Sequence, residues 1–354
     1  MPQEQIAQPS DAAAHADIHF GCIGCGACCD QPPDVRMVEA LSVADAFIMQ
    51  LEYARATLPR AGREEAVRIR GGFGTEGLTV YRPHDPQMIA TSMRDHFRAQ
   101  GDVVVTTRPN DDIEHHIFTI ARPLNLTLQA RCPALGEDGL CGVYERRPAM
   151  CRTVPLGWTV PDALAAAYLG AFTKRPGYKC DTSPNAPVMF RDGELVSLEY
   201  RAERDRAAAL SGAEAHRLAV LLVRGGSEGW PLIPTLPEIL EQTSTRLLLP
   251  LSVSFMPMVA AGIATETSIV RAAGQQLELM RSEREKNAGA RDRLAIAATP
   301  TKEYLLRNGI EALLDDLSRA TERFARPGFM HQWRQRDLTK KRVVNYADAS
   351  ARRR

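Results

Sequence analysis

The chain has 354 residues, of which 44% are hydrophobic and 25% are charged, the balance of a folded globular protein. Its formal net charge of +1 excludes the basic excess expected of a protein dedicated to coating nucleic acid. The first 20 residues lack a basic start followed by an apolar stretch, so they do not form a secretory signal. We therefore expect a cytoplasmic protein with reduced cysteines, because disulfides are rare in that compartment.

The first 200 residues are predicted to mix helices and strands. Residues 1–18 are expected to form a disordered leader. Residues 42–58 are predicted to be a helix with Ser42 as its N-cap, and Pro86 is predicted to open a helix that runs to residue 100.

The strands predicted for this part carry β-branched residues or alternate apolar and polar residues. Turn residues Asp192 and Gly193 predict a hairpin between the last two of these strands. The predicted strands are residues 103–106, 116–121, 126–130, 188–190 and 195–200.

After residue 200 the pattern becomes mainly helical, with predicted helices at residues 214–224, 268–286 and 300–324. Residues 230–237 are rich in proline and predict an extended linker. Residues 247–264 carry no charge, but two prolines in this stretch favour a buried core segment over a membrane span.

Eight cysteines, all before residue 181, are the strongest functional signal. Four of them form a C-x2-C-x2-C-C motif, in which Gly21, Gly24 and Gly26 allow a tight backbone curl with positive φ. Gly139 supports a turn between two later cysteines. We predict that the cysteines are metal ligands: Cys22, Cys25, Cys28, Cys29, Cys132, Cys141, Cys151 and Cys180. The isolated Cys180 fits a ligand and a plain buried thiol equally.

Zinc and iron–sulfur centres both fit this pattern. Zinc is held by four thiolates or imidazoles, so eight cysteines could supply two such sites. A [4Fe–4S] cluster takes three cysteines close in sequence and a remote Cys-Pro, which Cys22, Cys25, Cys28 and Cys132 provide. The sequence favours iron–sulfur slightly.

Together, these motifs resemble the YkgJ-type cysteine-cluster family, described as a zinc- or iron-chelating domain. The resemblance covers residues 19–180 and rests on C-x2-C-x2-C-C followed by C-x2-Y-x2-R-P-x2-C-R. Beyond the cysteines, the matching residues are Tyr144, Arg147, Pro148, Arg152 and Pro155. The family is distantly similar to flagellin lysine N-methylases, so the resemblance also implies a possible S-adenosylmethionine cofactor.

Two arginines of the motif are candidate cofactor-binding residues. Arg147 and Arg152 would offset the negative charge of a thiolate cluster. Alternatively, Arg147 pairs with a carboxylate such as Glu145 and stabilises the turn. Pro148 is predicted to open a short helix that carries Cys151.

Weaker signals favour structural roles. Gly72 to Gly77 spell G-x-G-x-x-G, but a strand is predicted after them, which favours a hairpin loop over a dinucleotide site. His115 and His116 are expected in a polar hairpin loop and not at a metal. His19 is the better candidate for a non-thiolate ligand.

We therefore expect an α+β protein in which a compact cysteine-cluster domain, residues 19–200, is followed by a helical region, residues 201–335, and a basic tail, residues 336–354. Three functions compete: a metal-chelating protein with a structural or redox centre, a protein-lysine methyltransferase, and an interaction protein with structural zinc. A protein partner or substrate would bind the helical region. Neither nucleic acid nor membrane is expected as a partner.

Overall fold

The computed structural model describes residues 17–29, 32–62, 86–124, 131–175, 177–230, 233–242, 246–286, 317–324 and 326. These residues form an α+β fold with two antiparallel sheets. The predicted fold class is therefore confirmed.

The larger sheet has five strands in the order β2-β5-β3-β8, and β4 pairs with β5 on the same edge as β2. Its two long strands pair over their whole length, from Met49 opposite Pro123 to Pro59 opposite Ile113. The strands are β2 (Val35–Arg36), β3 (Met49–Pro59), β4 (Val103–Thr106), β5 (Ile113–Pro123) and β8 (Arg246–Pro250).

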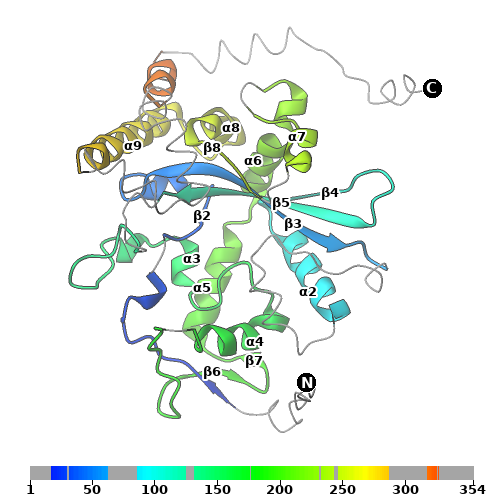
Figure 1. Cartoon of the computed structure of the whole chain (residues 1–354), viewed down its shortest axis with the longest axis vertical. Coiled ribbons are helices and arrows are strands. Elements are labelled where there is room, and N and C mark those ends of the chain that lie inside the picture. Colours follow the sequence, from blue (N-terminus) through cyan, green and yellow to red (C-terminus); the bar gives the residue numbers. More distant parts are fainter. Residues whose placement is uncertain are drawn as a thin grey trace, which may run out of the picture.

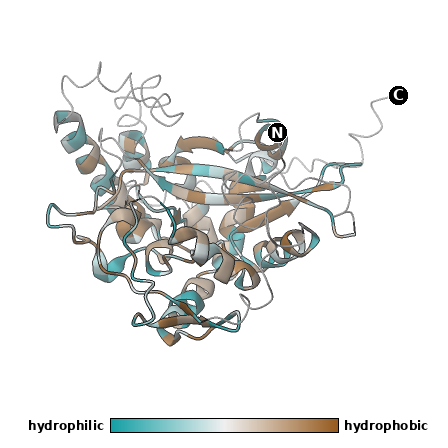
Figure 2. Ribbon diagram, turned by 60° about the horizontal axis from the view of Figure 1, so that its bottom comes forward, coloured by the Kyte–Doolittle hydropathy of each residue, from teal (hydrophilic) through white to brown (hydrophobic). Residues whose placement is uncertain are grey.

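Both faces of this sheet are buried, because successive side chains of a strand point to opposite faces. Leu51 and Tyr53 of β3 belong to one hydrophobic core, whereas Ala54 and Ala56 belong to another. Figure 2 shows hydrophobic residues along the strands and on the helices on either side of them.

Helices cover both faces of the sheet (Figure 1). One side has α6 (Ala213–Arg224), α7 (Leu236–Glu241), α8 (Phe255–Ala261) and α9 (Glu266–Lys286). The other has α2 (Pro86–Ala99), α3 (Ala149–Arg152), α4 (Asp162–Phe172) and α5 (Leu198–Ala209). Short 3₁₀ helices are Ala27–Cys29, Ala40–Val43, Tyr144–Arg146, Gly225–Glu228 and Leu251–Ser254.

A smaller sheet lies beside α4 and fixes the start of the described chain. β1 (Ile18–His19) pairs with β6 (Val188–Arg191), and β6 pairs with β7 (Glu194–Leu195). Phe20, Phe190 and Leu169 of α4 share one core. Phe20, two positions before the first cysteine, is thereby anchored to a segment about 170 positions later in the chain.

The predicted helix at residues 42–58 is wrong. Only the 3₁₀ helix Ala40–Val43 forms there, and β3 follows from Met49. Ser42 donates a hydrogen bond from Oγ to the Glu39 carbonyl instead of capping a helix. The mixed spacing of apolar residues suggested a helix, but it arises because both faces of this strand are buried.

Two other predictions also need correction. His115 and His116 lie within β5 and are buried, so the polar loop ends before them. The predicted strand 195–200 ends at Leu195, since α5 begins at Leu198. The hairpin turn itself is confirmed, with positive φ at Asp192 and Gly193.

The predicted helices at residues 86–100, 214–224 and 268–286 are confirmed by α2, α6 and α9. The strands predicted at 103–106 and 116–121 are confirmed within β4 and β5. The strand 126–130, the glycine motif 72–77 and most of the helix 300–324 lie outside the described residues.

The uncharged stretch 247–264 folds into β8, a 3₁₀ helix and α8, with Leu251, Phe255 and Met258 buried in the main core. None of the described helices is long and apolar enough to cross a membrane. Because β8 pairs with β3, residues far along the chain complete the sheet that begins with β2.

Candidate metal centre

The first cysteine motif is a curled loop fixed at both ends. At its start, Gly21 and Asp181 exchange backbone hydrogen bonds of 2.8 and 3.0 Å. Gly24 and Gly26 have φ of 66° and 70°, which side chains other than glycine rarely adopt. The loop ends in the 3₁₀ helix Ala27–Cys29. The predicted positive φ is thus confirmed for Gly24 and Gly26.

The second cysteine stretch is bonded directly to the first. The backbone N–H of Cys132 donates to the carbonyl of Cys29 over 2.8 Å. Leu135 and Cys141 form a β-bridge that closes the loop between the two cysteines, and Gly139 at its tip has φ 81°. Residues separated by more than a hundred positions therefore meet through the main chain.

The third stretch is α3, which carries Cys151. Pro148 precedes the helix, as predicted, and the Ala149 N–H donates to Oε1 of Glu39 over 2.9 Å. Thr153 donates from Oγ1 to the Ala149 carbonyl at the other end. A buried carboxylate from the segment between β2 and β3 thus fixes the short helix that presents Cys151.

All eight predicted ligands line one cavity of about 1040 Å³. None of them forms a disulfide. Cys22 and Cys25 are exposed, Cys132 is buried, and the other five are half-buried. Within the described ranges, no three His, Cys, Asp or Glu side chains are grouped tightly enough to hold a metal ion between them. The thiols thus share one cavity without meeting at one point.

One set of thiols interacts around Cys151. Burial and the neighbouring thiols of Cys132 and Cys141 raise the pKa of Cys151 to about 12. A hydrogen bond from the Cys28 thiol lowers the pKa of Cys29. Burial and the thiols of Cys132, Cys151 and Cys141 act on the Cys29 pKa in the opposite direction.

A second set surrounds Cys180. Its pKa is raised, first by burial and then by the thiols of Cys25, Cys22 and Cys28. The sequence left open whether Cys180 is a metal ligand or an isolated buried thiol. In the structure it has three other thiols as electrostatic neighbours, so it is not isolated.

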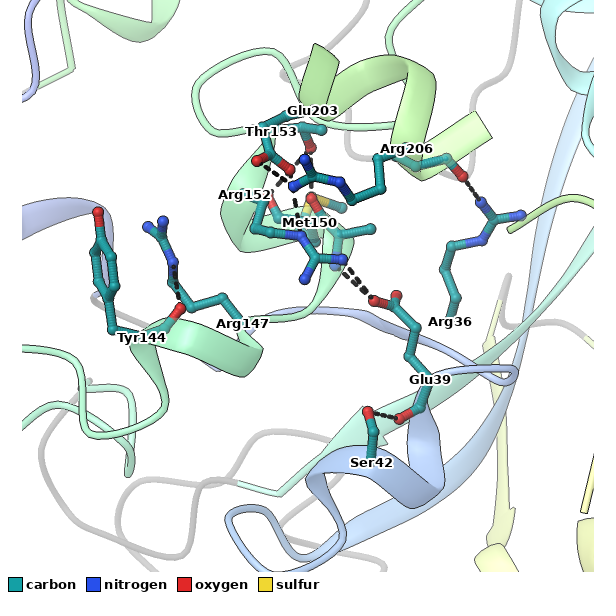
Figure 3. A network of polar contacts seen from close by, with 12 residues as sticks. Arg36, Glu39, Ser42, Tyr144, Arg147, Met150, Arg152, Thr153, Glu203 and Arg206 are labelled. Atoms are coloured by element: carbon teal, nitrogen blue, oxygen red, sulfur yellow. Dashed lines mark hydrogen bonds and ion pairs between the residues drawn. The ribbon is translucent and has the colours of Figure 1, made fainter. Parts of the chain in front are cut away.

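The two motif arginines have different surroundings (Figure 3). Arg152 lies between Glu39, at 3.6 Å, and Glu203, at 3.4 Å. The guanidinium carbon of Arg147 lies 3.9 Å from the centroid of the Tyr144 ring, and its Nε donates a hydrogen bond to the Tyr144 carbonyl. Among the described residues, Arg147 has no ion pair with a carboxylate such as Glu145.

The positive charge of Arg147 acts on the site. It lowers the pKa of the Cys151 thiol, against the larger effect of burial, and acts in the same direction on Tyr200. Both arginines line the cavity. Arg147 is thus placed to offset thiolate charge, while the charge of Arg152 is balanced by two carboxylates.

The histidines lie outside this arrangement. Nδ1 of His19 is 2.7 Å from the Ala186 carbonyl, and His19 does not line the cavity. His115 contacts Asp111 and His116 contacts Glu114, within and beside β5. Neither His115 nor His116 lines the cavity of the cysteines.

Sequence reasoning missed the contribution of α5. Tyr200 and Glu203 line the cavity, and the Tyr200 ring packs edge-on against Phe20 at 6.0 Å. The pKa of Tyr200 is raised by burial and then by the Cys22 thiol. No spacing in the cysteine motifs points to these residues, because they lie in a helix that had been predicted in part as a strand.

Residues 21–174 match the model of the CxxCxxCC family, whose description is "Putative zinc- or iron-chelating domain". The matched stretch covers less than half of the chain, and it contains seven of the eight cysteines. Cys180 and α5 lie beyond the matched residues. No curated protein and no solved structure matches the chain significantly.

Proposed function

Because residues 21–174 match the model of the CxxCxxCC family, we propose that this protein binds an iron–sulfur centre through its cysteine thiolates. One observation carries the proposal: all eight thiols, from stretches separated by more than a hundred residues, line a single cavity. Thiolates are the ligands of both zinc and iron–sulfur clusters, so the donor set fits either. The centre serves a structural or a redox role.

The spacing of the first three cysteines supports a [4Fe–4S] cluster. Such a cluster is bound by cysteines spaced as in C-x2-C-x2-C. Cys22, Cys25 and Cys28 have this spacing on one curled loop.

Anaerobic purification followed by iron, sulfide and zinc analysis tests this function. We expect a brown protein that contains iron and sulfide, and the Cys25→Ser variant should lose metal. Ala27→Ser, in the same loop, is the matched control and should keep it. Zinc without iron would overturn the iron–sulfur proposal, and a protein without any tightly bound metal would overturn chelation itself.

The remaining part of the cavity supports a second candidate, methyl transfer to a protein lysine from S-adenosylmethionine. Beyond the cysteines the wall is aromatic, with Tyr168, Phe172 and Tyr178, so an organic ligand has apolar surface to contact. Calorimetric titration of the metal-loaded protein with S-adenosylmethionine tests it. Saturable binding, followed by labelling of lysine in a partner captured through the helical region, would support it, and no binding would reject it.

A further inference from the structure

We infer that the eight cysteines form two four-thiolate centres and not one. The outer centre consists of Cys22, Cys25, Cys28 and Cys180, and the inner centre of Cys29, Cys132, Cys141 and Cys151. This inference rests on the proposed chelating function and assigns its ligands. Four cysteines are a complete ligand set both for zinc and for a [4Fe–4S] cluster.

The outer set is assembled by a strand-like contact. Gly21 and Asp181 form a hydrogen-bonded antiparallel pair. The next residues outward, Cys22 and Cys180, therefore face each other on one side of the two chains. The positive φ of Gly24 and Gly26 curls the loop after Cys22, so that Cys25 and Cys28 approach the same Cys180 thiol.

The inner set is assembled by the two loops that follow. The hydrogen bond from Cys132 to Cys29 joins them, and the bridge between Leu135 and Cys141 brings Cys141 back to Cys132. Cys151 enters from α3 and interacts with the thiols of Cys132 and Cys141. These four cysteines are thus linked to one another without any contribution from Cys22, Cys25 or Cys180.

The boundary between the centres falls inside the pair Cys28-Cys29. Both residues lie in a 3₁₀ helix, where consecutive side chains leave the axis about 120° apart. Cys28 neighbours Cys180, and Cys29 neighbours Cys132. Cys28 also donates to Cys29 and interacts with Cys151, which places the two centres side by side.

The two centres differ in access to solvent. The outer centre includes the exposed residues Cys22 and Cys25, whereas the inner centre includes the buried Cys132. The outer centre is therefore the one that can exchange its metal, and the inner centre is the structural one.

Metal stoichiometry of the full chain tests the partition. We expect two centres per chain in the wild type, and half of that content in either Cys180→Ser or Cys141→Ser. The double variant should hold none, while Ala27→Ser should keep both centres. If Cys180→Ser fails to fold, as judged by circular dichroism and size-exclusion chromatography, Cys22→Ser takes its place, and Cys29→Ser likewise replaces Cys141→Ser.

Chelator kinetics supply the second readout. The wild type should release metal in two phases, and the fast phase should be absent from Cys180→Ser. One centre per chain in the wild type, or loss of all metal from either single variant, would overturn the partition while leaving chelation intact. A wild-type chain without metal would instead overturn the proposed function.

Discussion

In the large sheet, β3 and β5 pair along eleven residues of β3 and both faces are buried, whereas the cysteine-bearing loops consist of short elements around a cavity of about 1040 Å³. The sheet is stabilised by apolar burial between two layers of helices. The loops are joined by a few backbone hydrogen bonds, such as that from Cys132 to Cys29, and their thiols line the cavity. If the proposed metal is bound, the sheet should fold by packing and the loops should depend on the metal for much of their order.

Removing the metal should give the largest effect, and only in the loops. Structural zinc contributes about 10 kcal/mol or more to the folding of small metal domains. After a chelator has removed the metal, we expect hydrogen exchange to accelerate strongly at the amides of Gly21, Cys132 and Gly136. Exchange at the amides of β3 and β5 should stay unchanged. Equal acceleration in the sheet would show that the two regions are not distinct.

Phe118→Ala should affect the sheet and spare the centre. Phe118 is 1% exposed and packs edge-on against Phe97 at 4.9 Å. The cavity left by this change should cost about 3–5 kcal/mol of the free energy of unfolding, measured by urea denaturation. Phe118→Leu is the control, with a smaller loss. Metal content per folded chain should stay at the wild-type level, and its loss would contradict the comparison.

Cys151 lies in α3, which Glu39 holds independently of the metal, so this thiol should stay buried and nearly unreactive once the metal is gone. Its pKa of about 12, against an ordinary value of 9.0, reduces the thiolate fraction at neutral pH about a thousandfold. Alkylation of metal-free protein, followed by mass spectrometry, should label Cys22 long before Cys151. The rate at Cys151 should rise about tenfold per pH unit. Equal rates at pH 7 would show that the inner thiols are not buried.

The smallest effect is expected at Glu39, which links the two regions. Burial raises its pKa above the ordinary value of 4.5, although the Ala149 N–H and Arg152 oppose the shift. Its contribution to stability is therefore complete below pH 4.5 and is lost as pH rises through the folded pKa. The free energy of unfolding of the wild type should therefore fall by at most about 1.4 kcal/mol per pH unit between pH 4 and 7. Glu39→Gln should remove this fall, as measured by urea denaturation at each pH. If the pH dependence of the free energy of unfolding is the same in Glu39→Gln and in the wild type, the dependence does not come from Glu39.

Local signals predicted the parts of the fold that local chemistry decides. Pro86 and Pro148 begin helices as expected, and Gly24, Gly26 and Gly139 adopt the positive φ that their turns need. The cysteine motif also predicted the tight curl of residues 22–29, because the glycines between the cysteines permit positive φ.

Long-range pairing decided the rest. Residues 49–59 have an apolar spacing compatible with a helix, and only their pairing with β5 and β8 makes them a strand. His115 and His116 are polar, yet they are buried in β5. The proximity of Cys180 to Cys22 depends on the contact between Gly21 and Asp181, which no sequence spacing reveals.

The exposed thiols of Cys22 and Cys25 offer the most direct test of metal binding. The protein fold does not shield these two side chains, so only a bound ligand can slow their alkylation. Alkylation rates at both residues are measured by mass spectrometry before and after a chelator removes the metal. The metal-bound protein should react more slowly by at least about a hundredfold. Equal rates in the two states would contradict the account.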